Sequence, residues 1–353
     1  MTSTTSNAVS AATAVVAGAR SAAASRRILS GDRPTGPLHL GHYFGSVANR
    51  VNLQAAGGEL FLVIADYQVI TDRDTPGSVR DRTLGLVLDY LGCGIDPDRS
   101  VIFPHSAVPA LHQLMLPFLS LVNSGELDRN PTVKEEIRLA GRRSVSGLML
   151  TYPVHQAADI LFCKADLVPV GRDQLPHLEL ARAIARRFNE RYRPVFPLPS
   201  ALLGEAGLLA GLDGRKMSKS LGNSIGLADD PDTVAAKVLA ARTDSERLIS
   251  FEPDRRPAVA NLLRLAALCG GHEPAELAEQ VGNGGGSALK QLVIEAVNDF
   301  LAPIRARRAA CTLSDAAELL ARGAQQAREI ADRTLAEVVQ AMGMDHGGLY
   351  HLG

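Results

Sequence analysis

The chain has 353 residues, with 37 lysines and arginines against 38 aspartates and glutamates, so its formal net charge is −1. A chain of this length buries a substantial core and more often forms two domains than one. The balanced charge excludes a globally basic nucleic-acid-binding protein, so any nucleic acid would have to meet a local basic face.

The rest of the composition disfavours membrane-spanning and disulfide-stabilised proteins. The sequence has no run of about 18 apolar residues, so we expect no transmembrane helix. The four cysteines, at positions 93, 163, 269 and 311, form no CxxC pair, which predicts free thiols in a reducing cytosol and no structural metal site. Residues 1–26 are rich in Ala, Ser and Thr and lack the pattern of a secretory signal, so we predict a disordered tail.

Short apolar runs that alternate with helical patterns predict a doubly wound parallel α/β sheet. The second run, 59–66, is continuously apolar from Leu60 to Ala65 and ends in the polar Asp66; such a run is typical of a central strand covered on both faces. The predicted strands are 27–30, 59–66, 101–103 and 167–170. The predicted helices run from 39 through 53 and over 78–91, 110–121 and 178–188, with a surface loop and helix start at 129–136.

Polar residues follow three of these strands. The first strand leads through a turn into Gly36-Pro37-Leu38-His39-Leu40-Gly41-His42, and a strand-to-helix turn of this kind points N–H groups and imidazoles at an anion. Asp66 and Gln68 follow the second strand, and Gly171 and Asp173 follow the last. Open α/β sheets bind ligands at the carboxyl ends of their strands, so we expect a ligand site there.

A helical stretch at 151–161 carries three polar residues at helical spacing. If Pro153 lies in the first turn of a helix, Tyr152, Gln156 and Asp159 share one face. Polar groups inside an apolar stretch are costly to bury unless they find partners. The spacing alone leaves a ligand site and a hydrogen-bonded structural cluster equally open.

A glycine-rich segment at 204–214 leads into Gly214-Arg215-Lys216-Met217-Ser218-Lys219-Ser220. Two lysines three residues apart, flanked by small hydroxyl residues, make a cationic loop that can close on a polyphosphate. This loop and the turn at 36–42 are together a much stronger signal than either is alone.

Beyond residue 226 the pattern changes to helices without strands. Helical periodicity covers 231–241 and 257–269, a glycine-rich flexible connector is expected at 282–287, and a capping-box pattern at Thr312 and Asp315 opens a final helix. We expect the apolar stripe of that helix to be the core of a helical bundle. The predicted organisation is a tail at 1–26, an α/β domain at 27–225 and a helical domain at 226–353.

Four motifs, in this order, resemble those of class I aminoacyl-tRNA synthetases, and within that class those of the bacterial tryptophanyl-tRNA synthetase family. The resemblance covers nearly all of 27–344. The motifs are the extended first signature at 30–42, the helix at 151–161, the strand and turn at 168–174, and the lysine loop at 216–220.

The resemblance implies a Rossmann-like catalytic domain followed by an all-helical domain that binds the tRNA anticodon. It implies activation of L-tryptophan with ATP to tryptophanyl-adenylate and pyrophosphate. Transfer to the 2′-hydroxyl of the terminal adenosine of tRNA(Trp) follows. Mg²⁺ is expected to be held by the phosphates and not by protein carboxylates. The family also implies a homodimer in the cytoplasm.

Activation brings two anionic partners together, so the protein mainly positions them and neutralises charge on the departing pyrophosphate. The resemblance assigns that neutralisation to Lys216, Lys219 and Lys134. It assigns the phosphates to the catalytic His42 and the backbone near Gly41, the ribose to Gly171 and Asp173, and the adenine to Leu208. The whole ATP site implied by the resemblance comprises Arg33, Pro34, Thr35, His39, Gly41, His42, Gly171, Arg172, Asp173, Leu208, Lys216, Met217, Ser218, Lys219 and Ser220.

For the amino acid, the resemblance makes Asp159 the acceptor of the indole N–H, while Tyr152 and Gln174 orient the ammonium group. A buried, aimed acceptor rejects analogues that lack the N–H far better than an apolar slot does. No dedicated metal ligand is implied. The implied tryptophan pocket comprises Leu29, Gly31, Gln68, Tyr152, Gln156, Asp159, Val168, Val170 and Gln174.

Three positions depart from the family pattern and indicate a divergent subgroup. Gln68 stands where many bacterial members have histidine, Gln156 where methionine is usual, and Leu29 where phenylalanine is usual. Because Gln68 would alter contacts shared by substrate and mimic, we hypothesise an auxiliary enzyme that tolerates tryptophan-mimicking inhibitors. The sequence does not decide between a housekeeping and an auxiliary role.

Alternatives remain from the same motifs. The spacing of Tyr152, Gln156 and Asp159 also resembles the tyrosyl-tRNA synthetase pocket, although the other motifs fit the tryptophan enzyme better. A non-catalytic, partner-binding synthetase homologue is the second alternative. Small nucleotidyltransferases share the first signature, but they are short and lack a helical second half.

In the helical half, the segment 242–245 matches a family motif for tRNA binding. Three arginines of the same half lie close together in sequence. Arg305, Arg307 and Arg308 are candidates either for tRNA phosphate contacts or for a solvated helix face.

Overall fold

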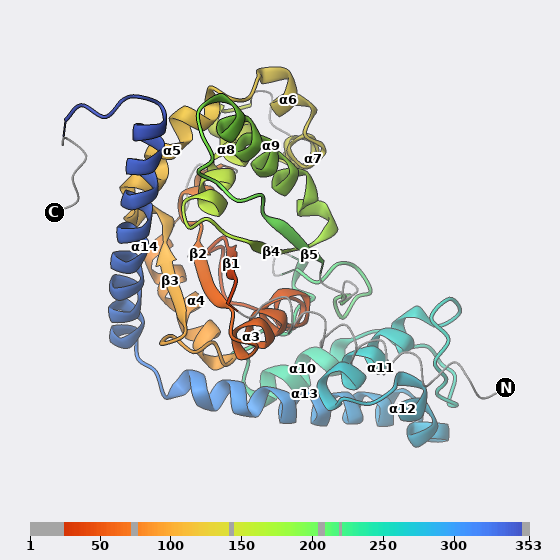
Figure 1. Cartoon of the computed structure of the whole chain (residues 1–353). Helices are drawn as coiled ribbons and strands as arrows, with labels where there is room; N and C mark the ends of the chain where they lie inside the picture. Colours follow the sequence, from red (N-terminus) through yellow and green to blue (C-terminus); the bar gives the residue numbers. More distant parts are fainter. Residues whose placement is uncertain (1–24, 72–76, 141–144, 204–208, 219–220, 348–353) are drawn as a thin grey trace.

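The structure, a computed structural model, describes residues 25–71, 77–140, 145–203, 209–218 and 221–347. At its centre is a five-stranded, wholly parallel sheet in the order β3-β2-β1-β4-β5 (Figure 1). The predicted doubly wound sheet is therefore confirmed. The strands are β1 (Arg27–Asp32), β2 (Glu59–Ile64), β3 (Ser100–Pro104), β4 (Leu167–Val170) and β5 (Ser200–Leu203).

The sequence predicted four of these strands but not β5. This edge strand has four residues, most of them exposed, so it lacks the apolar run that marks its neighbours. The predicted helices are all present. In the α/β part they are α2 (Leu40–His42), α3 (Ala48–Ala55), α4 (Val79–Gly92), α5 (Pro109–Leu119), α6 (Ser124–Arg129), α7 (Pro131–Ala140), α8 (Gly147–Leu161) and α9 (Leu175–Arg191), with short turns η1 (Tyr43–Val47), η2 (Tyr67–Ile70), η3 (His105–Ala107) and η4 (Arg172–Gln174).

The strand order reverses beside β1. From β1 the chain moves outward to β2 and β3, and then returns to the other side of β1 to form β4 and β5. In a parallel sheet the carboxyl ends of all strands point to one edge, and a crevice opens where the direction of winding changes. The carboxyl ends of β1 and β4 therefore define the expected ligand site.

The sheet is apolar on both faces because alternate side chains of its strands enter different cores. Ile28 and Leu62 pack with α3, α4 and the helices beyond residue 230, whereas Leu29 and Phe61 pack with α5, α8, α9 and α14. All four of these side chains are at least 96 % buried. This double coverage explains the continuous apolar run in β2.

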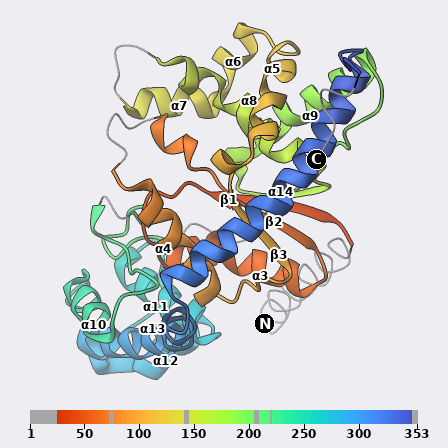
Figure 2. The ribbon, with the colours of Figure 1, turned by 90° about the vertical axis from the view of Figure 1, so that its left-hand side faces the viewer.

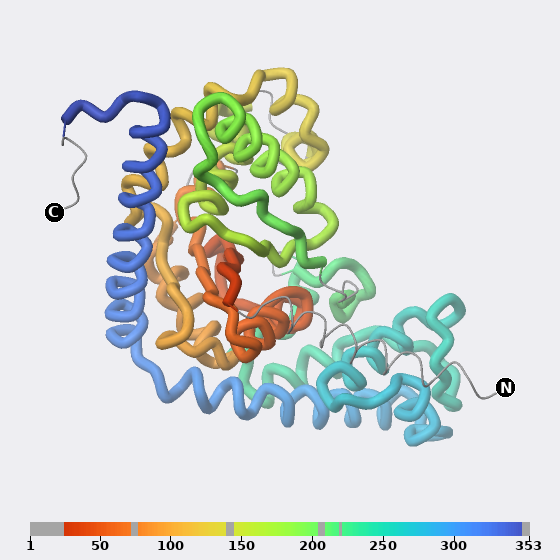
Figure 3. The backbone as a smooth tube through the Cα atoms, in the orientation of Figure 1, coloured from red at the N-terminus to blue at the C-terminus, as the bar shows by residue number. Residues whose placement is uncertain are grey.

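The second half of the chain is helical. Figure 3 follows it as a tube, in which α13 runs beneath the sheet and the chain then turns upward into α14. None of the helices that the structure describes is both long and apolar enough to cross a lipid bilayer. The elements are α10 (Pro231–Ala240), α11 (Pro257–Gly270), α12 (Pro274–Val281), η6 (Gly282–Gly284), α13 (Gly285–Ala309) and α14 (Leu313–Ala341).

The predicted flexible connector at 282–287 is wrong. This segment forms η6 and the first turn of α13, and Ile249 donates its backbone N–H to the Gly282 oxygen at 2.8 Å. Gly282 and Gly285 have positive φ angles of 51° and 72°. The glycines therefore serve an ordered turn, because a residue with a Cβ atom adopts such angles only with strain.

The sequence predicted that the last helix belongs to a helical bundle, and this prediction is wrong. The predicted capping box at Thr312 and Asp315 is confirmed, but α14 crosses the sheet beside β3 (Figure 2). Ala324, Ala327 and Ala331 belong to the same core as Phe103. A Cβ atom on Gly323 would lie 2.0 Å from the Ile102 oxygen, so glycine permits this close approach.

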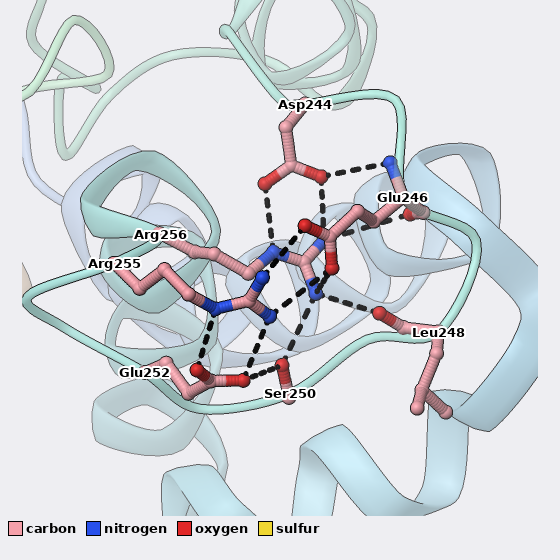
Figure 4. A network of polar contacts seen from close by, with 7 residues as sticks. All are labelled: Asp244, Glu246, Leu248, Ser250, Glu252, Arg255 and Arg256. Carbon is pink, nitrogen blue, oxygen red and sulfur yellow. Dashed lines mark hydrogen bonds and ion pairs between the residues drawn. The ribbon is translucent and has the colours of Figure 1, made fainter.

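A loop between α10 and α11 is held by a polar network around a buried arginine (Figure 4). Arg256 is 4 % exposed and donates to both carboxylate oxygens of Asp244, at 2.7 Å and 2.5 Å, and to the Leu248 oxygen at 2.6 Å. Outside it, Arg255 bridges Glu246 and Glu252. Asp244 of the 242–245 motif therefore has a structural task in this loop.

The three arginines of α13 contact the protein itself. Arg305 donates to the Asp229 oxygen at 3.0 Å and Arg307 to the Gly92 oxygen at 2.8 Å. Arg308 donates to Asp89 at 2.8 Å, and the same buried carboxylate accepts the Leu38 N–H at 2.7 Å. These contacts fix α13 to neighbouring segments, while Arg307 is exposed and contact with tRNA phosphates stays a prediction.

A buried ion pair supports the end of β1. Arg50 is 3 % exposed and donates to Asp32 at 2.5 Å, to Ser30 at 2.8 Å and to the Gly31 oxygen at 3.1 Å, while the Tyr90 hydroxyl donates to Asp32 at 2.7 Å. Burial alone would raise the pKa of Asp32, but the Arg50 charge and these hydrogen bonds lower that pKa to about 2.

Replacement of Arg50 by methionine should strongly destabilise the fold. Asp32 would keep a buried charge without its partner, which typically costs about 3–5 kcal/mol. The free energy of unfolding, measured with urea near pH 7, should fall by that amount. The matched control is Arg322→Met, which removes an exposed pair with Asp98 and should stay within about 0.5 kcal/mol of wild type. Equal losses in the two variants would contradict this assignment.

Candidate functional site

A cavity of about 360 Å³ opens at the carboxyl ends of β1 and β4. All nine residues predicted for the tryptophan pocket lie on its wall. They are Leu29, Gly31, Gln68, Tyr152, Gln156, Asp159, Val168, Val170 and Gln174. The sequence did not predict several further lining residues, among them Ser46, Thr71, Glu136, Ile160 and His177.

Helix α8 supplies three of these side chains. Tyr152, Gln156 and Asp159 all face the cavity, so the predicted common face is confirmed. The condition from which this face was argued, Pro153 in the first turn, is not met, because Ser146 caps the helix earlier by accepting the Met149 N–H at 3.1 Å. Pro153 therefore lies inside the helix.

Tyr152 has a partner across the cavity wall. Its hydroxyl lies 3.2 Å from His177 Nε2, and His177 Nδ1 lies 3.3 Å from the Asn130 amide. Burial, together with the nearby Glu136 carboxylate, raises the pKa of Tyr152, and burial lowers the pKa of His177 to about 4. Near neutral pH this corner of the cavity therefore presents an uncharged phenol backed by a neutral imidazole.

A second group of histidines lies beside Asp159. His105 Nδ1 is 3.1 Å from Asp159 Oδ1. His155 Nδ1 is 3.2 Å from the Gln68 amide, and His155 Nε2 is 2.8 Å from His112 Nδ1. Burial lowers the pKa of His155 to about 4 and lowers that of His112 as well.

These histidines were not predicted from the sequence, although two sequence features point to them. His105 directly follows β3, so it occupies a strand end like those that were noted after β1, β2 and β4. His155 precedes Asp159 by one helical turn on α8, and residues four apart in a helix lie side by side.

A smaller cavity of about 200 Å³ adjoins the first and shares Asp32 and Arg33 with it. Its wall is formed by Asp32, Arg33, Thr35, Gly36, Leu38 and His42. His39 is buried, and its backbone N–H donates to His42 Nδ1 at 3.2 Å, which fixes the orientation of the His42 ring. The predicted first signature thus borders a polar cavity beside the larger one.

The lysine loop contacts the first signature. The Gly41 N–H lies 3.3 Å from Met217 Sδ. Backbone bonds join Leu40 N to the Ile225 oxygen and Leu227 N to the Leu38 oxygen, each at 3.0 Å. Two motifs that are far apart in sequence are therefore neighbours in the fold, as their joint prediction requires.

Asn223 holds the base of the lysine loop. Its amide donates to the Lys216 oxygen at 3.1 Å and to Asp213 at 2.7 Å, and its oxygen accepts the Ser218 N–H at 2.8 Å. Lys216 itself is exposed. The backbone that carries the Lys216 ammonium group is thus held in place by Asn223. Lys219, Ser220 and Leu208 lie outside the described residues.

The remaining predicted residues have different positions: Gly171 lines the larger cavity, whereas Arg172, Asp173, Lys134 and Pro34 are not among the lining residues of either cavity. Gly171, Arg172 and Asp173 are exposed at η4, and Lys134 is exposed on α7. A Cβ atom on Gly171 would lie 2.6 Å from Asp173 Oδ1, so a larger residue there would displace the Asp173 carboxylate. Pro34 is buried, and its oxygen accepts a bond from Arg82 at 2.8 Å.

Comparison with known sequences gives a consistent family. A family model described as "tRNA synthetases class I (W and Y)" matches residues 22–302. The chain is 44 % identical over 341 residues to the tryptophan–tRNA ligase of Treponema pallidum, a match that covers 92 % of this chain and 99 % of that protein. It is 41 % identical to the tryptophan–tRNA ligase of Streptococcus pyogenes serotype M1, covering 90 % and 98 %.

Solved structures agree. The tryptophanyl-tRNA synthetase of Campylobacter jejuni, determined with ADP and tryptophan, superposes with a TM-score of 0.80 at 30 % identity and covers 90 % of this chain and 99 % of that one. The tyrosyl-tRNA synthetase of Archaeoglobus fulgidus gives a TM-score of 0.62 at 24 % identity. At that identity the second likeness shows the fold alone.

Acidification should destabilise the protein through His155 and His177. Their folded pKa values lie near 4, whereas a histidine in an unfolded chain titrates near 6.5. Between these values the unfolded chain binds more protons, so stability is lost as pH falls from about 6.5 towards 4, by up to about 1.4 kcal/mol per pH unit for each histidine.

Urea unfolding at a series of pH values from about 4.5 to 7.5 measures this dependence. A double variant, H155N with H177N, should show a shallower slope than wild type. The exposed His272 supplies the control H272N, whose slope should match wild type. An unchanged slope in the double variant would show that these two rings do not cause the loss.

Proposed function

The chain belongs to the class I tRNA synthetases for tryptophan and tyrosine, and on that premise we propose how its residues perform the reaction of a tryptophan–tRNA ligase. The tryptophan assignment holds because relatives at 41–44 % identity over at least 90 % of the chain are tryptophan–tRNA ligases. The tyrosyl alternative rested on the spacing of Tyr152, Gln156 and Asp159. It is wrong, because these relatives are tryptophan–tRNA ligases.

The observation that carries the residue assignment is the convergence of nine predicted residues on one cavity at the strand ends. In this proposal Asp159, 3 % exposed at the wall, accepts the indole N–H of tryptophan. Val168 and Val170 form apolar walls around the ring. Tyr152 and Gln174 orient the ammonium group, so that the carboxylate points towards the smaller cavity.

ATP would bind along the smaller cavity, with its phosphates near His42 and Gly41 and its ribose near Gly171 and Asp173. A carboxylate oxygen of tryptophan attacks the α-phosphorus, and pyrophosphate leaves. Lys216, with Lys219 and Lys134, would neutralise the charge that develops on the leaving group. The contact between Met217 and Gly41 supports this arrangement, since it holds the lysine loop beside the phosphate-binding turn.

Mg²⁺ would enter with the nucleotide and would supply further neutralisation of phosphate charge. The residues around the smaller cavity fit a magnesium ion whose ligands are phosphate oxygens and not protein carboxylates. Asp32 is the one carboxylate on that wall, and its oxygen is already bonded to Arg50 and Tyr90. Magnesium commonly binds through substrate phosphates and water rather than through an all-protein site.

In the second step the 2′-hydroxyl of the terminal adenosine of tRNA(Trp) attacks the carbonyl carbon of the adenylate, and AMP leaves. We propose that the helices beyond residue 226 meet the anticodon. We also propose that the enzyme works as a homodimer in the cytoplasm, where its tRNA substrate is used. The division into domains at 27–225 and 226–353 is part of this proposal.

Pyrophosphate exchange tests the function and the site together. The wild-type protein should exchange pyrophosphate into ATP with tryptophan and not with tyrosine. Asp159→Asn should lower kcat/KM for tryptophan by about 100-fold, since a buried charged acceptor would lose its charge. Asp98→Asn, at an exposed position, is the control and should behave like wild type.

If no amino acid supports pyrophosphate exchange, the non-catalytic, partner-binding alternative would be favoured. Exchange with tryptophan that is unchanged in Asp159→Asn would keep the function but contradict the role of Asp159.

A second proposal concerns tolerance of tryptophan-mimicking inhibitors. Gln68 is 7 % exposed on the cavity wall, and its amide is hydrogen-bonded to His155 at 3.2 Å. The hydrogen bond to His155 supports the proposal that Gln68 makes different contacts in the cavity from the histidine that many relatives carry at this position. An auxiliary, inhibitor-tolerant enzyme would follow from that change.

Gln68→His should therefore increase sensitivity to a competitive tryptophan mimic. Because the change affects one polar contact, we expect the inhibition constant to fall by about tenfold. Inhibition should be measured in the exchange assay, with KM for tryptophan determined in parallel. A variant inhibited no more strongly than wild type would exclude this proposal.

A further inference from the structure

His105 lies directly behind the carboxylate of Asp159. The ring is 0 % exposed and sits at the carboxyl end of β3, while Asp159 comes from α8 and reaches the cavity wall. We infer that His105 is a positioning residue, which donates its Nδ1–H to Asp159 Oδ1 and holds the other carboxylate oxygen towards the cavity. This inference rests on the proposed function, in which Asp159 accepts the indole N–H.

The direction of the bond follows from the other ring nitrogen. The backbone N–H of Tyr67 points at His105 Nε2, at 3.0 Å, and shares its proton with Asp66 Oδ1, at 3.1 Å, which itself lies 3.4 Å from Nε2. A backbone N–H can only donate, and Nε2 lies closer to this N–H than to Asp66 Oδ1, so we assign Nε2 as the acceptor. A neutral imidazole that accepts at Nε2 carries its proton at Nδ1. Nδ1 therefore donates to Asp159 Oδ1 at 3.1 Å.

The surroundings leave His105 little freedom to rotate. The His155 ring lies 4.7 Å from it between centroids, the His112 ring 5.6 Å and the Tyr67 ring 5.6 Å. The pKa of His155 is lowered by burial to about 4, so this neighbour is neutral near pH 7. The orientation of His105, and through it that of Asp159, is thus set by two strand ends, those of β2 and β3, and by two helices, α5 and α8.

This support should decide discrimination rather than binding in general. A carboxylate held by one donor presents a fixed acceptor to a ligand, and a fixed acceptor favours ligands with an N–H in the right place. A ligand without that N–H gains nothing from the orientation. Loss of the His105 donor should therefore reduce selectivity for the N–H more than it reduces binding of the apolar ring.

The same atoms also offer a different interpretation. His105, His155 and Asp159 each place one potential metal-ligand atom within 4.8 Å of the others. These atoms already have hydrogen-bond partners without a cation. His105 is bonded to Tyr67 and to Asp159, and His155 is bonded to Gln68. The experiment below distinguishes the two.

Two variants separate the two ring nitrogens. In H105N the amide nitrogen takes the place of Nδ1 and can still donate to Asp159. In H105Q the amide oxygen takes the place of Nε2 and can still accept from Tyr67, but no donor faces Asp159. The readout is the ratio of kcat/KM for tryptophan to that for β-(3-benzothienyl)alanine, in which sulfur replaces the indole N–H.

We expect H105Q to lower this ratio about tenfold or more, mainly through KM for tryptophan, because a hydrogen bond to a charged group is lost. H105N should keep most of the ratio, whatever its stability. Equal ratios in wild type and H105Q, or a larger loss in H105N than in H105Q, would overturn the inference.

Two further measurements test the inference independently of the kcat/KM ratio. ¹⁵N NMR of histidine-labelled wild type should show His105 protonated at Nδ1, and a proton at Nε2 alone would overturn the inference. A metal ion that copurifies with wild type and is lost in both variants would also overturn it. Absence of tryptophan-dependent exchange in wild type would overturn the proposed function first, and this inference with it.

Discussion

The pairing of residues 38–40 with 225–227 is the contact on which the catalytic arrangement depends. These short segments exchange backbone hydrogen bonds at 3.0 Å, and the pairing brings the lysine loop to the turn that follows β1. Met217 then packs on Gly41, so the phosphate-binding turn and its cationic loop share one support.

Much of the fold follows from the sequence because its causes are local. Apolar runs predicted β1 to β4, and the Ser78 and Thr312 caps begin α4 and α14 near the expected positions. The nine cavity residues were accessible because strand ends and a helical face gather side chains in a known direction. The short edge strand β5 gave no such signal.

The errors have a different origin, namely contacts between distant segments. Nothing in the spacing of α14 tells a bundle from the face of a sheet, because both bury one apolar stripe. The arginines of α13 look solvent-exposed in sequence, yet Arg308 finds Asp89 on α4. His105 escaped notice because its partner, Asp159, lies on an element that only the tertiary fold brings near.

The position of α14 also bears on synthesis of the protein. Residues 313–341 cover apolar side chains of the sheet and of α5, such as Phe103 and Leu111, which are fully buried in the finished fold. The ribosome delivers those earlier residues long before α14 emerges. During that interval the nascent chain exposes an unfinished apolar face, and such faces are where chaperones bind and aggregation starts.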